Sequence, residues 1–204
     1  MQRIRIKFAK GPEAKFTSHL DLIRCFERAI RRTDLPIAYS SGFNPRMRIA
    51  WGPPLQLGFE SVCEMADIEI DGWIKPADLK DKINSALPKG FKVLEAVLAD
   101  PKGTSLASSM NMAEYVVSIE AADIEEIRGR INGILGLEKI EIDKDGKLVN
   151  KRPLLHKLEA TEDPQMIAIT VEVGSRGTLK PRDVLDMIDG IKVKAIRRVA
   201  LFVS

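Results

Sequence analysis

Arginines on a predicted helix are the side chains whose spacing in this sequence best fits a binding chemistry. Arg24, Arg28 and Arg31 fall at positions i, i+4 and i+7 of a helix predicted over residues 19–32, so they share one face, opposite an apolar stripe. Acidic residues of the same helix stand at spacings that allow ion pairs, so an ordinary solvated face is the alternative. Combined with the next segment, the pattern favours an anion-binding face.

Two further arginines have aromatic neighbours. Arg46 and Arg48 point to one side of an extended segment, whereas Met47, Ile49 and Trp51 point to the other. Arginines for phosphates and aromatics for base stacking are typical of surfaces that bind single-stranded RNA or DNA, although Trp51 could equally belong to the core. The predicted nucleic-acid-binding residues are Arg24, Arg28, Arg31, Arg46, Arg48, Phe43 and Trp51. Three carboxylates could instead pair with the arginines of this segment: Glu60, Glu64 and Asp67.

His19 is the one candidate for acid–base catalysis. It stands in the first turn of the predicted helix, between Ser18 and Asp21, whose spacing is typical of a capping box. The helix N-terminus disfavours the protonated imidazole, and the neutral form suits a general base. Because no second catalytic partner is evident, a histidine packed at the rim of the apolar face is the alternative.

The loop over residues 41–46 is the third candidate. Gly42 permits backbone conformations closed to other residues, Pro45 stiffens the chain, and Phe43 needs either a pocket in the protein or a partner. The loop residues predicted to contact a partner are Ser41, Gly42, Asn44 and Pro45.

The charge is unevenly distributed. The 204 residues hold 32 Lys and Arg against 29 Asp and Glu, a net charge of +3, and 45% are apolar, which is ordinary globular composition. The first 60 residues carry 11 basic and 5 acidic side chains, or +6, so the remainder sums to −3. An anionic partner should therefore meet the first quarter of the chain.

Several classes of protein lack their sequence signals here. Cys25 and Cys63 are too few for a disulfide framework or a cysteine-based metal site, and they read as buried or incidental thiols. Motifs of dinucleotide-binding, phosphate-loop, zinc-protease and serine-hydrolase sites are absent from the sequence. The N-terminus has no apolar signal region, and no apolar run reaches the roughly 18–20 residues of a membrane span. We expect a cytoplasmic protein with no cofactor, metal or membrane partner.

The chain alternates between predicted strands and helices. The first half has a strand at 3–9, the helix at 19–32, extended segments at 36–40 and 46–51, a strand at 64–71, a helix at 76–87 and a strand at 91–99. The second half has a strand at 113–120, a helix at 123–134, strands at 137–143 and 167–173, a helix at 181–188 and a strand at 192–203. Both halves fit the βαββαβ order of ferredoxin-like domains in an α+β protein.

The two halves share a short motif. Residues 72–83 match residues 177–188 at 6 of 12 positions, with a constant offset of 105. We interpret this as an internal duplication that gives tandem ferredoxin-like domains at 1–100 and 113–204, joined by a polar linker at 101–112. The alternative is that Lys-Pro-x-Asp is a favourable helix start, met twice by chance.

Four segments carry a family resemblance. Residues 18–22 (SHLDL), 39–45 (YSSGFNP), 54–58 (PLQLG) and 67–70 (DIEI) together resemble the radical-SAM-associated family of bacterial proteins, whose domain has no assigned function. The resemblance is dense over residues 1–72. Members occur beside, or fused behind, radical SAM proteins, so the resemblance implies such a partner. Three closely spaced cysteines hold the cluster of a radical SAM enzyme, whereas the two cysteines here stand 38 residues apart, so this chain is not that enzyme.

A more distant likeness is to the CRISPR repeat-processing endoribonucleases, which are also tandem ferredoxin-like folds. Some of them have a histidine near the first helix, and His19 would be the matching residue. Those nucleases carry a glycine-rich loop near the C-terminus, where residues 190–198 of this chain read GIKVKAIRR. The likeness therefore implies a fold and not an activity.

These observations give three functional hypotheses. The first is a non-catalytic accessory protein that binds RNA through the basic face and serves a radical SAM partner. The second is a metal-independent ribonuclease that uses His19. The third is a protein-only adaptor that docks an acidic partner protein through the loop over residues 41–45 and the basic face.

Overall fold

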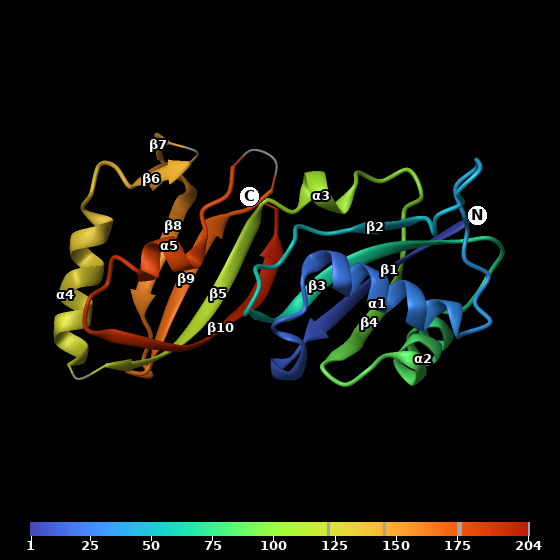
Figure 1. The fold of residues 1–204 in the computed structure, drawn as a ribbon, viewed down its shortest axis with the longest axis horizontal. Coiled ribbons are helices and arrows are strands. Elements are labelled where there is room, and N and C mark those ends of the chain that lie inside the picture. The colour runs from blue at the N-terminus through green and yellow to red at the C-terminus, as the bar shows by residue number, and fades with distance from the viewer. Residues whose placement is uncertain (122, 145, 175–176, 204) are drawn as a thin grey trace. The chain divides into compact units, whose positions relative to one another are not determined.

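The computed structural model describes residues 1–121, 123–144, 146–174 and 177–203. The chain divides into two compact units, residues 1–110 and 111–204, and each combines strands with helices, so the α+β class predicted from the sequence is confirmed (Figure 1). Among the described residues, no helix has the length and apolar character needed to cross a membrane.

The first unit follows the order βαββαβ. Its elements are β1 (Gln2–Lys10), α1 (His19–Arg31), β2 (Ile49–Trp51), β3 (Glu60–Ile70), α2 (Pro76–Ala86), β4 (Phe91–Ala99) and a short additional helix, α3 (Leu106–Ser109). The strands lie in the order β4-β1-β3-β2, and all neighbours are antiparallel. Residues 101–112, predicted as a linker, include α3, whose Leu106 is fully buried.

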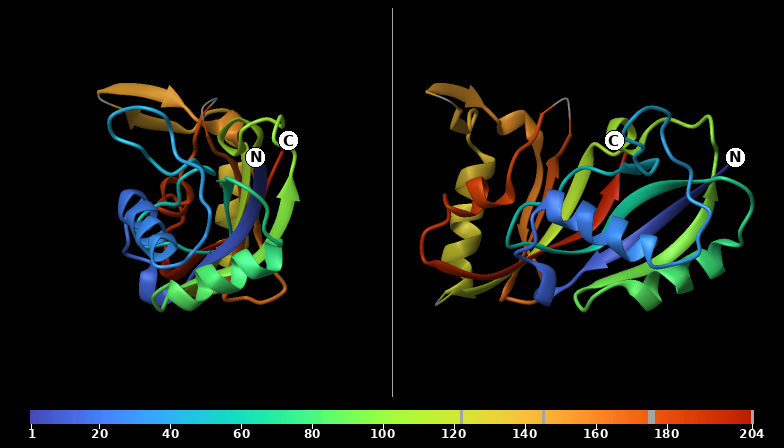
Figure 2. Two further views of the ribbon diagram at one scale, coloured as in Figure 1. Left: turned by 90° about the vertical axis from the view of Figure 1, so that its right-hand side faces the viewer. Right: turned by 45° about the vertical axis from the view of Figure 1, so that its right-hand side comes forward.

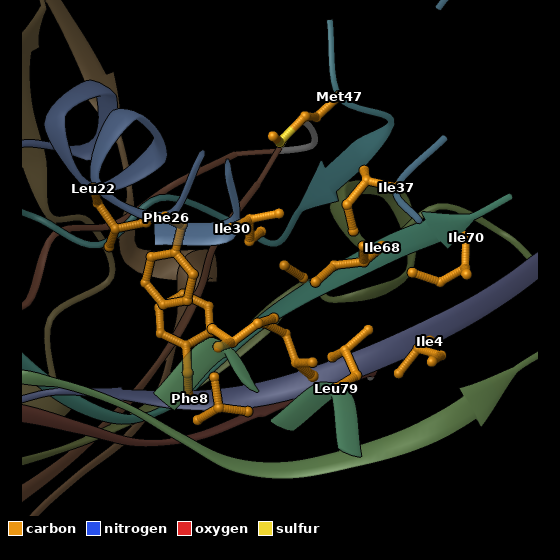
Figure 3. Packing of buried hydrophobic residues seen from close by; sticks show 14 residues of the cluster. Ile4, Phe8, Leu22, Phe26, Ile30, Ile37, Met47, Ile68, Ile70 and Leu79 are labelled. Carbon is orange, nitrogen blue, oxygen red and sulfur yellow. The ribbon is translucent and has the colours of Figure 1, made fainter. Parts of the chain in front are cut away.

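Alternation along β1 explains how this unit is layered. Ile4, Ile6 and Phe8 are buried, whereas the charged residues between them point to the other side of the sheet. Phe26 of α1 and Leu79 of α2 belong to the same buried cluster (Figure 3). Both helices therefore cover one face of the sheet, as Figure 2 shows, and leave the face with the β1 charges free of helices α1 and α2.

The first helix begins where the sequence predicts. The Ser18 hydroxyl accepts a hydrogen bond from the Asp21 backbone N–H at 3.1 Å and donates to the Asp21 carboxylate at 2.7 Å. This side-chain cap satisfies one of the amide groups left open at the start of a helix. It fixes the first turn, and with it the direction in which the arginines of α1 point.

The second unit has the same strand order with an added hairpin. Its elements are β5 (Met112–Ala121), α4 (Ile124–Leu135), β6 (Glu141–Lys144), β7 (Lys147–Asn150), β8 (Leu155–Ala160), β9 (Met166–Glu172), α5 (Pro181–Leu185) and β10 (Ile191–Phe202). The strands of its sheet run β10-β5-β9-β8, and β6 pairs only with β7.

One predicted strand of the second unit was misplaced. The segment 137–143 was expected in the sheet, but β6 forms a separate hairpin, and β8 holds the sheet position beside β9. The sequence does not reveal β8, because its buried residues Leu155 and Leu158 are three apart and do not alternate. A register shift between Leu155 and Lys157 accounts for that spacing.

Candidate nucleic-acid interface

Three arginines of the first unit surround a hollow beside helix α1. Arg24, Arg28 and Arg32 line it together with Asp21, Cys25 and Pro88, and its volume is about 340 Å³. We call this cavity the α1 hollow. The Arg32 guanidinium donates a hydrogen bond of 2.5 Å to the Ala86 carbonyl at the end of α2, so this side chain is held at the rim.

The structure changes the third member of the predicted arginine set. Arg31 does not line the α1 hollow and instead forms an ion pair of 3.6 Å with Glu27. Successive residues of a helix point about 100° apart, so only one of Arg31 and Arg32 can face the turn that carries Pro88. The spacing in the sequence favours Arg31, because it places Arg31 on the same helix face as Arg24 and Arg28. The sequence does not show that the end of α2 lies beside Arg32.

The charges around the α1 hollow are only partly neutralised. Arg24 pairs with Asp21 at 3.4 Å, and its side chain remains 67% exposed. Among the described residues, no carboxylate pairs with Arg28. Burial raises the pKa of the Cys25 thiol above its ordinary value, and the positive charges of Arg32 and Arg28 offset part of that rise. The hollow therefore presents a neutral thiol among cationic side chains.

Arg46 and Arg48 lie on a separate hairpin. An isolated bridge between Tyr39 and Met47 closes it, Met47 is buried, and both arginines are exposed, as the alternation predicts. Arg48 has a carboxylate partner, because its Nε lies 2.7 Å from a carboxylate oxygen of Glu69. Within the described residues, Arg46 takes part in no ion pair.

Asp67 and Glu69 pair with three arginines on the face of the first sheet opposite α1 and α2. Asp67 was predicted to pair with Arg46 or Arg48, but it accepts two hydrogen bonds from Arg5, at 2.8 and 2.9 Å. Glu69 holds Arg48 and also lies 3.6 Å from Arg3. The predicted Glu60 and Glu64 are both buried. A second hollow of about 310 Å³ on this face is thus lined by arginines that already have carboxylate partners.

The predicted partner-binding loop is exposed. Ser41, Gly42, Asn44 and Pro45 all face solvent, and Phe43 is as exposed as in an extended chain, at 106%. The loop is closed at its base, where the Ser40 N–H donates to the Arg46 carbonyl at 2.8 Å and the Arg46 N–H donates to the Ser40 hydroxyl at 3.0 Å. Phe43 therefore lies at the tip of an anchored loop.

Trp51 is packed against the core. Its ring meets Phe26 edge-on at a centroid distance of 5.5 Å and Phe8 at 6.0 Å. The indole is half-buried, so these contacts occupy the ring that was predicted to stack on a base.

His19 occupies the first position of α1 and is half-buried. That position fits both interpretations of this side chain, a rim residue and a general base. Among the residues that the structure describes, no three His, Cys, Asp or Glu side chains come together in a way that could hold a metal ion.

A family model matches residues 3–181 of the chain, and its description is an uncharacterized protein conserved in bacteria, DUF2344. The chain belongs to the DUF2344 family. A comparison with curated proteins finds no match.

This DUF2344 protein also resembles a solved structure. A chain in the crystal structure of a Cbf5-Nop10-Gar1 complex matches 97% of it with a TM-score of 0.52 and 10% sequence identity. The DUF2344 chain spans about half of that protein, 48% of its length. At this identity the likeness concerns the fold alone.

Proposed function

We propose that this DUF2344 protein binds single-stranded RNA through the first unit and is an accessory of a radical SAM enzyme. The observation that carries the RNA part is Arg28, which stands between Arg24 and Arg32 on one helix face with no carboxylate partner among the described residues. An exposed guanidinium without a carboxylate partner can bind an anion without giving up an existing ion pair, and a phosphodiester supplies such an anion.

The net charge of each unit supports this assignment. Residues 1–110 hold 17 basic and 13 acidic side chains, a net charge of +4, whereas residues 111–204 hold 15 basic and 16 acidic side chains, or −1. On α4, the corresponding helix of the second unit, Arg128 and Arg130 both pair with glutamates of the same helix, at 2.6 and 2.5 Å. The first unit is therefore the better electrostatic partner for a polyanion.

An exposed aromatic ring supplies the second element of RNA binding. Phe43 buries almost none of its surface in the protein, and base stacking is the favourable use of such a ring on a basic surface. Phosphate contacts from arginines would position the strand, while stacking would hold an unpaired base.

The enzyme partner is proposed from the family resemblance of residues 18–22 and 39–45. Both segments lie in the first unit, at the start of α1 and in the loop that carries Phe43. A cytoplasmic location follows from the same proposal. In this role the protein holds the RNA, and the chemistry is done by the partner.

We also infer that the two units arose by duplication. Their sheets share one strand order, β4-β1-β3-β2 in the first and β10-β5-β9-β8 in the second. The matched segments 72–83 and 177–188 each lead into a helix that starts at a proline, Pro76 in α2 and Pro181 in α5. After the duplication, the first unit would have become basic and acquired RNA binding, whereas the second unit would not.

A salt titration tests RNA binding. Fluorescence anisotropy with a labelled single-stranded RNA should give a log Kd that changes linearly with log salt, with a slope of roughly 0.7 per phosphate contact. Arg28→Ala should weaken binding and reduce that slope, whereas the matched control Arg128→Ala on α4 should change neither. Absent binding, or binding that ignores salt, would overturn the proposal, and cleavage of the RNA that is lost in His19→Ala would favour the ribonuclease instead.

A further inference from the structure

Three positively charged side chains line the α1 hollow. Arg24, Arg28 and Arg32 stand on successive turns of α1 and its C-cap, about 6 Å apart along the helix axis. Long side chains on adjacent turns can converge on one point between them. The volume of about 340 Å³ falls at the lower end of the range for small-ligand pockets.

The acidic residue at the rim leaves the charge of the hollow positive. The Asp21 carboxylate already has partners, since it accepts a hydrogen bond from the Ser18 hydroxyl at 2.7 Å and lies 3.4 Å from Arg24. Arg32 is positioned by the Ala86 carbonyl, which takes one of its five N–H donors and leaves the others available. The Arg28 guanidinium forms no hydrogen bond or ion pair with any residue that the structure describes, so all five of its N–H donors are available.

We propose that the α1 hollow is a phosphate-binding site formed by Arg24, Arg28 and Arg32. The inference rests on the proposed function and sharpens it, because it assigns one phosphate group of the RNA to one place. A planar guanidinium can bind two oxygens of a phosphate at once, so three arginines around one hollow can hold a phosphate from several sides, and within the described residues only Arg24 among them is paired with a carboxylate, that of Asp21. Both a backbone phosphodiester and a terminal phosphate have this chemistry.

Two other groups of arginines among the described residues already have carboxylate partners. On the face of the first sheet opposite α1 and α2, Arg3, Arg5 and Arg48 each pair with a carboxylate. On α4 both arginines pair with glutamates. A phosphate at either place would have to displace a carboxylate, whereas at Arg28 it would not.

Cys25 provides a reporter inside the hollow. Its thiol lines the same cavity, and Cys63, the other thiol of the chain, is only 2% exposed. Iodoacetamide is uncharged, so the arginines neither attract nor repel it, and mass spectrometry of peptides separates the two cysteines. A group bound in the hollow should shield Cys25 from alkylation.

The experiment measures the alkylation rate of Cys25 with inorganic phosphate, with an RNA that has a 5′-phosphate and with the same RNA without it. At about ten times the Kd of each ligand, the rate should fall about tenfold, since only the free fraction reacts. Protection by both RNAs alike identifies a backbone phosphate, and protection by the 5′-phosphorylated RNA alone identifies a terminal one. Either result supports the site.

Matched variants separate the site from general charge. Arg28→Ala should abolish the protection, whereas Arg31→Ala removes an equal charge three residues away, outside the hollow, and should keep it. The Arg28 side chain forms no hydrogen bond or ion pair among the described residues, so its removal should leave the fold intact. A thermal melt of the variant checks this.

Two outcomes distinguish this inference from the proposed function. RNA that binds in the anisotropy assay yet leaves the alkylation of Cys25 unchanged overturns the phosphate site and leaves RNA binding standing. Protection by inorganic phosphate without any RNA binding supports the site and overturns the RNA proposal.

Discussion

Arg48 and Glu69 form an ion pair in which the guanidinium Nε lies 2.7 Å from a carboxylate oxygen. Arg28 has no such partner among the described residues, although both side chains belong to the predicted RNA-binding set. An arginine that already has a carboxylate gains less from a phosphate, because the first contact must be exchanged for the second. The two arginines should therefore contribute unequally.

Arg48→Ala should weaken RNA binding less than Arg28→Ala does. We expect a loss of about tenfold in affinity for Arg28→Ala, which corresponds to one charge-assisted hydrogen bond, and about twofold for Arg48→Ala. Anisotropy titrations of both variants at one salt concentration measure this. Equal losses of RNA affinity in the two variants would show that the ion pair with Glu69 does not reduce the contribution of Arg48 to binding.

The pH dependence of Cys25 alkylation tests the electrostatics of the α1 hollow. Burial raises the pKa of this thiol above 9.0, and Arg32 and Arg28 lower it in part. The alkylation rate, which follows the thiolate, should thus rise through a midpoint above pH 9.0 in the native protein. Removing one positive charge in Arg28→Ala should move the midpoint to higher pH. A midpoint that moves down would contradict the assigned cause.

The same shift has a consequence for stability. A thiol whose folded pKa is raised favours the folded state at every pH below its unfolded value of 9.0, and this contribution is lost as the pH rises through the folded pKa. Urea denaturation between pH 7 and 10 should show a decline in the free energy of unfolding from about pH 9.0 that is smaller in Cys25→Ala.

Gly90 is a position where the fold admits no side chain. Its φ is +90°, and a Cβ there would lie 2.8 Å from the Ala14 nitrogen and 2.9 Å from the Ala14 Cβ. Its carbonyl also accepts a 2.7 Å hydrogen bond from Gly11. Gly42 has a φ of +127° but no atom within 4 Å of its Cβ position. Gly90→Ala should lower the free energy of unfolding by at least about 1 kcal/mol more than Gly42→Ala does. Both changes strain a backbone with positive φ, but only the Cβ at position 90 would also clash with Ala14. Chemical denaturation measures the difference.

The sequence predicts local structure well where one signal acts alone. The alternation in β1 and the capping pattern at Ser18 each identify an element to within a residue or two, because both depend only on neighbours in the chain. The choice between Arg31 and Arg32 depends on where the end of α2 lies, and the ion pair of Arg48 depends on the register between β2 and β3. Such long-range contacts leave no local pattern, so the site could be predicted only in part.

Phe43→Ala should separate binding from folding. The ring makes no contribution to the core at 106% exposure, so the free energy of unfolding should change by less than about 0.5 kcal/mol. The lost stacking should lower RNA affinity by roughly 1–3 kcal/mol. Trp51→Ala is the contrasting variant, since its contacts with Phe8 and Phe26 predict a loss of stability of about 2–4 kcal/mol. An unchanged RNA affinity in Phe43→Ala would remove this ring from the interface.

Purification of the tagged protein from a native host tests the proposed enzyme partner. We expect an iron–sulfur protein with three closely spaced cysteines to co-purify, identified by its visible absorption and by mass spectrometry. Nuclease treatment should leave this partner bound if the proteins touch directly and release it if RNA joins them. A chain with its loop residues Asn44 and Pro45 changed to alanine addresses the same contact, because both are exposed and lie beside Phe43 in the loop. Loss of the partner in this variant with RNA affinity retained would place the protein contact in the loop, whereas the absence of any iron–sulfur protein from the native preparation would reject the partnership.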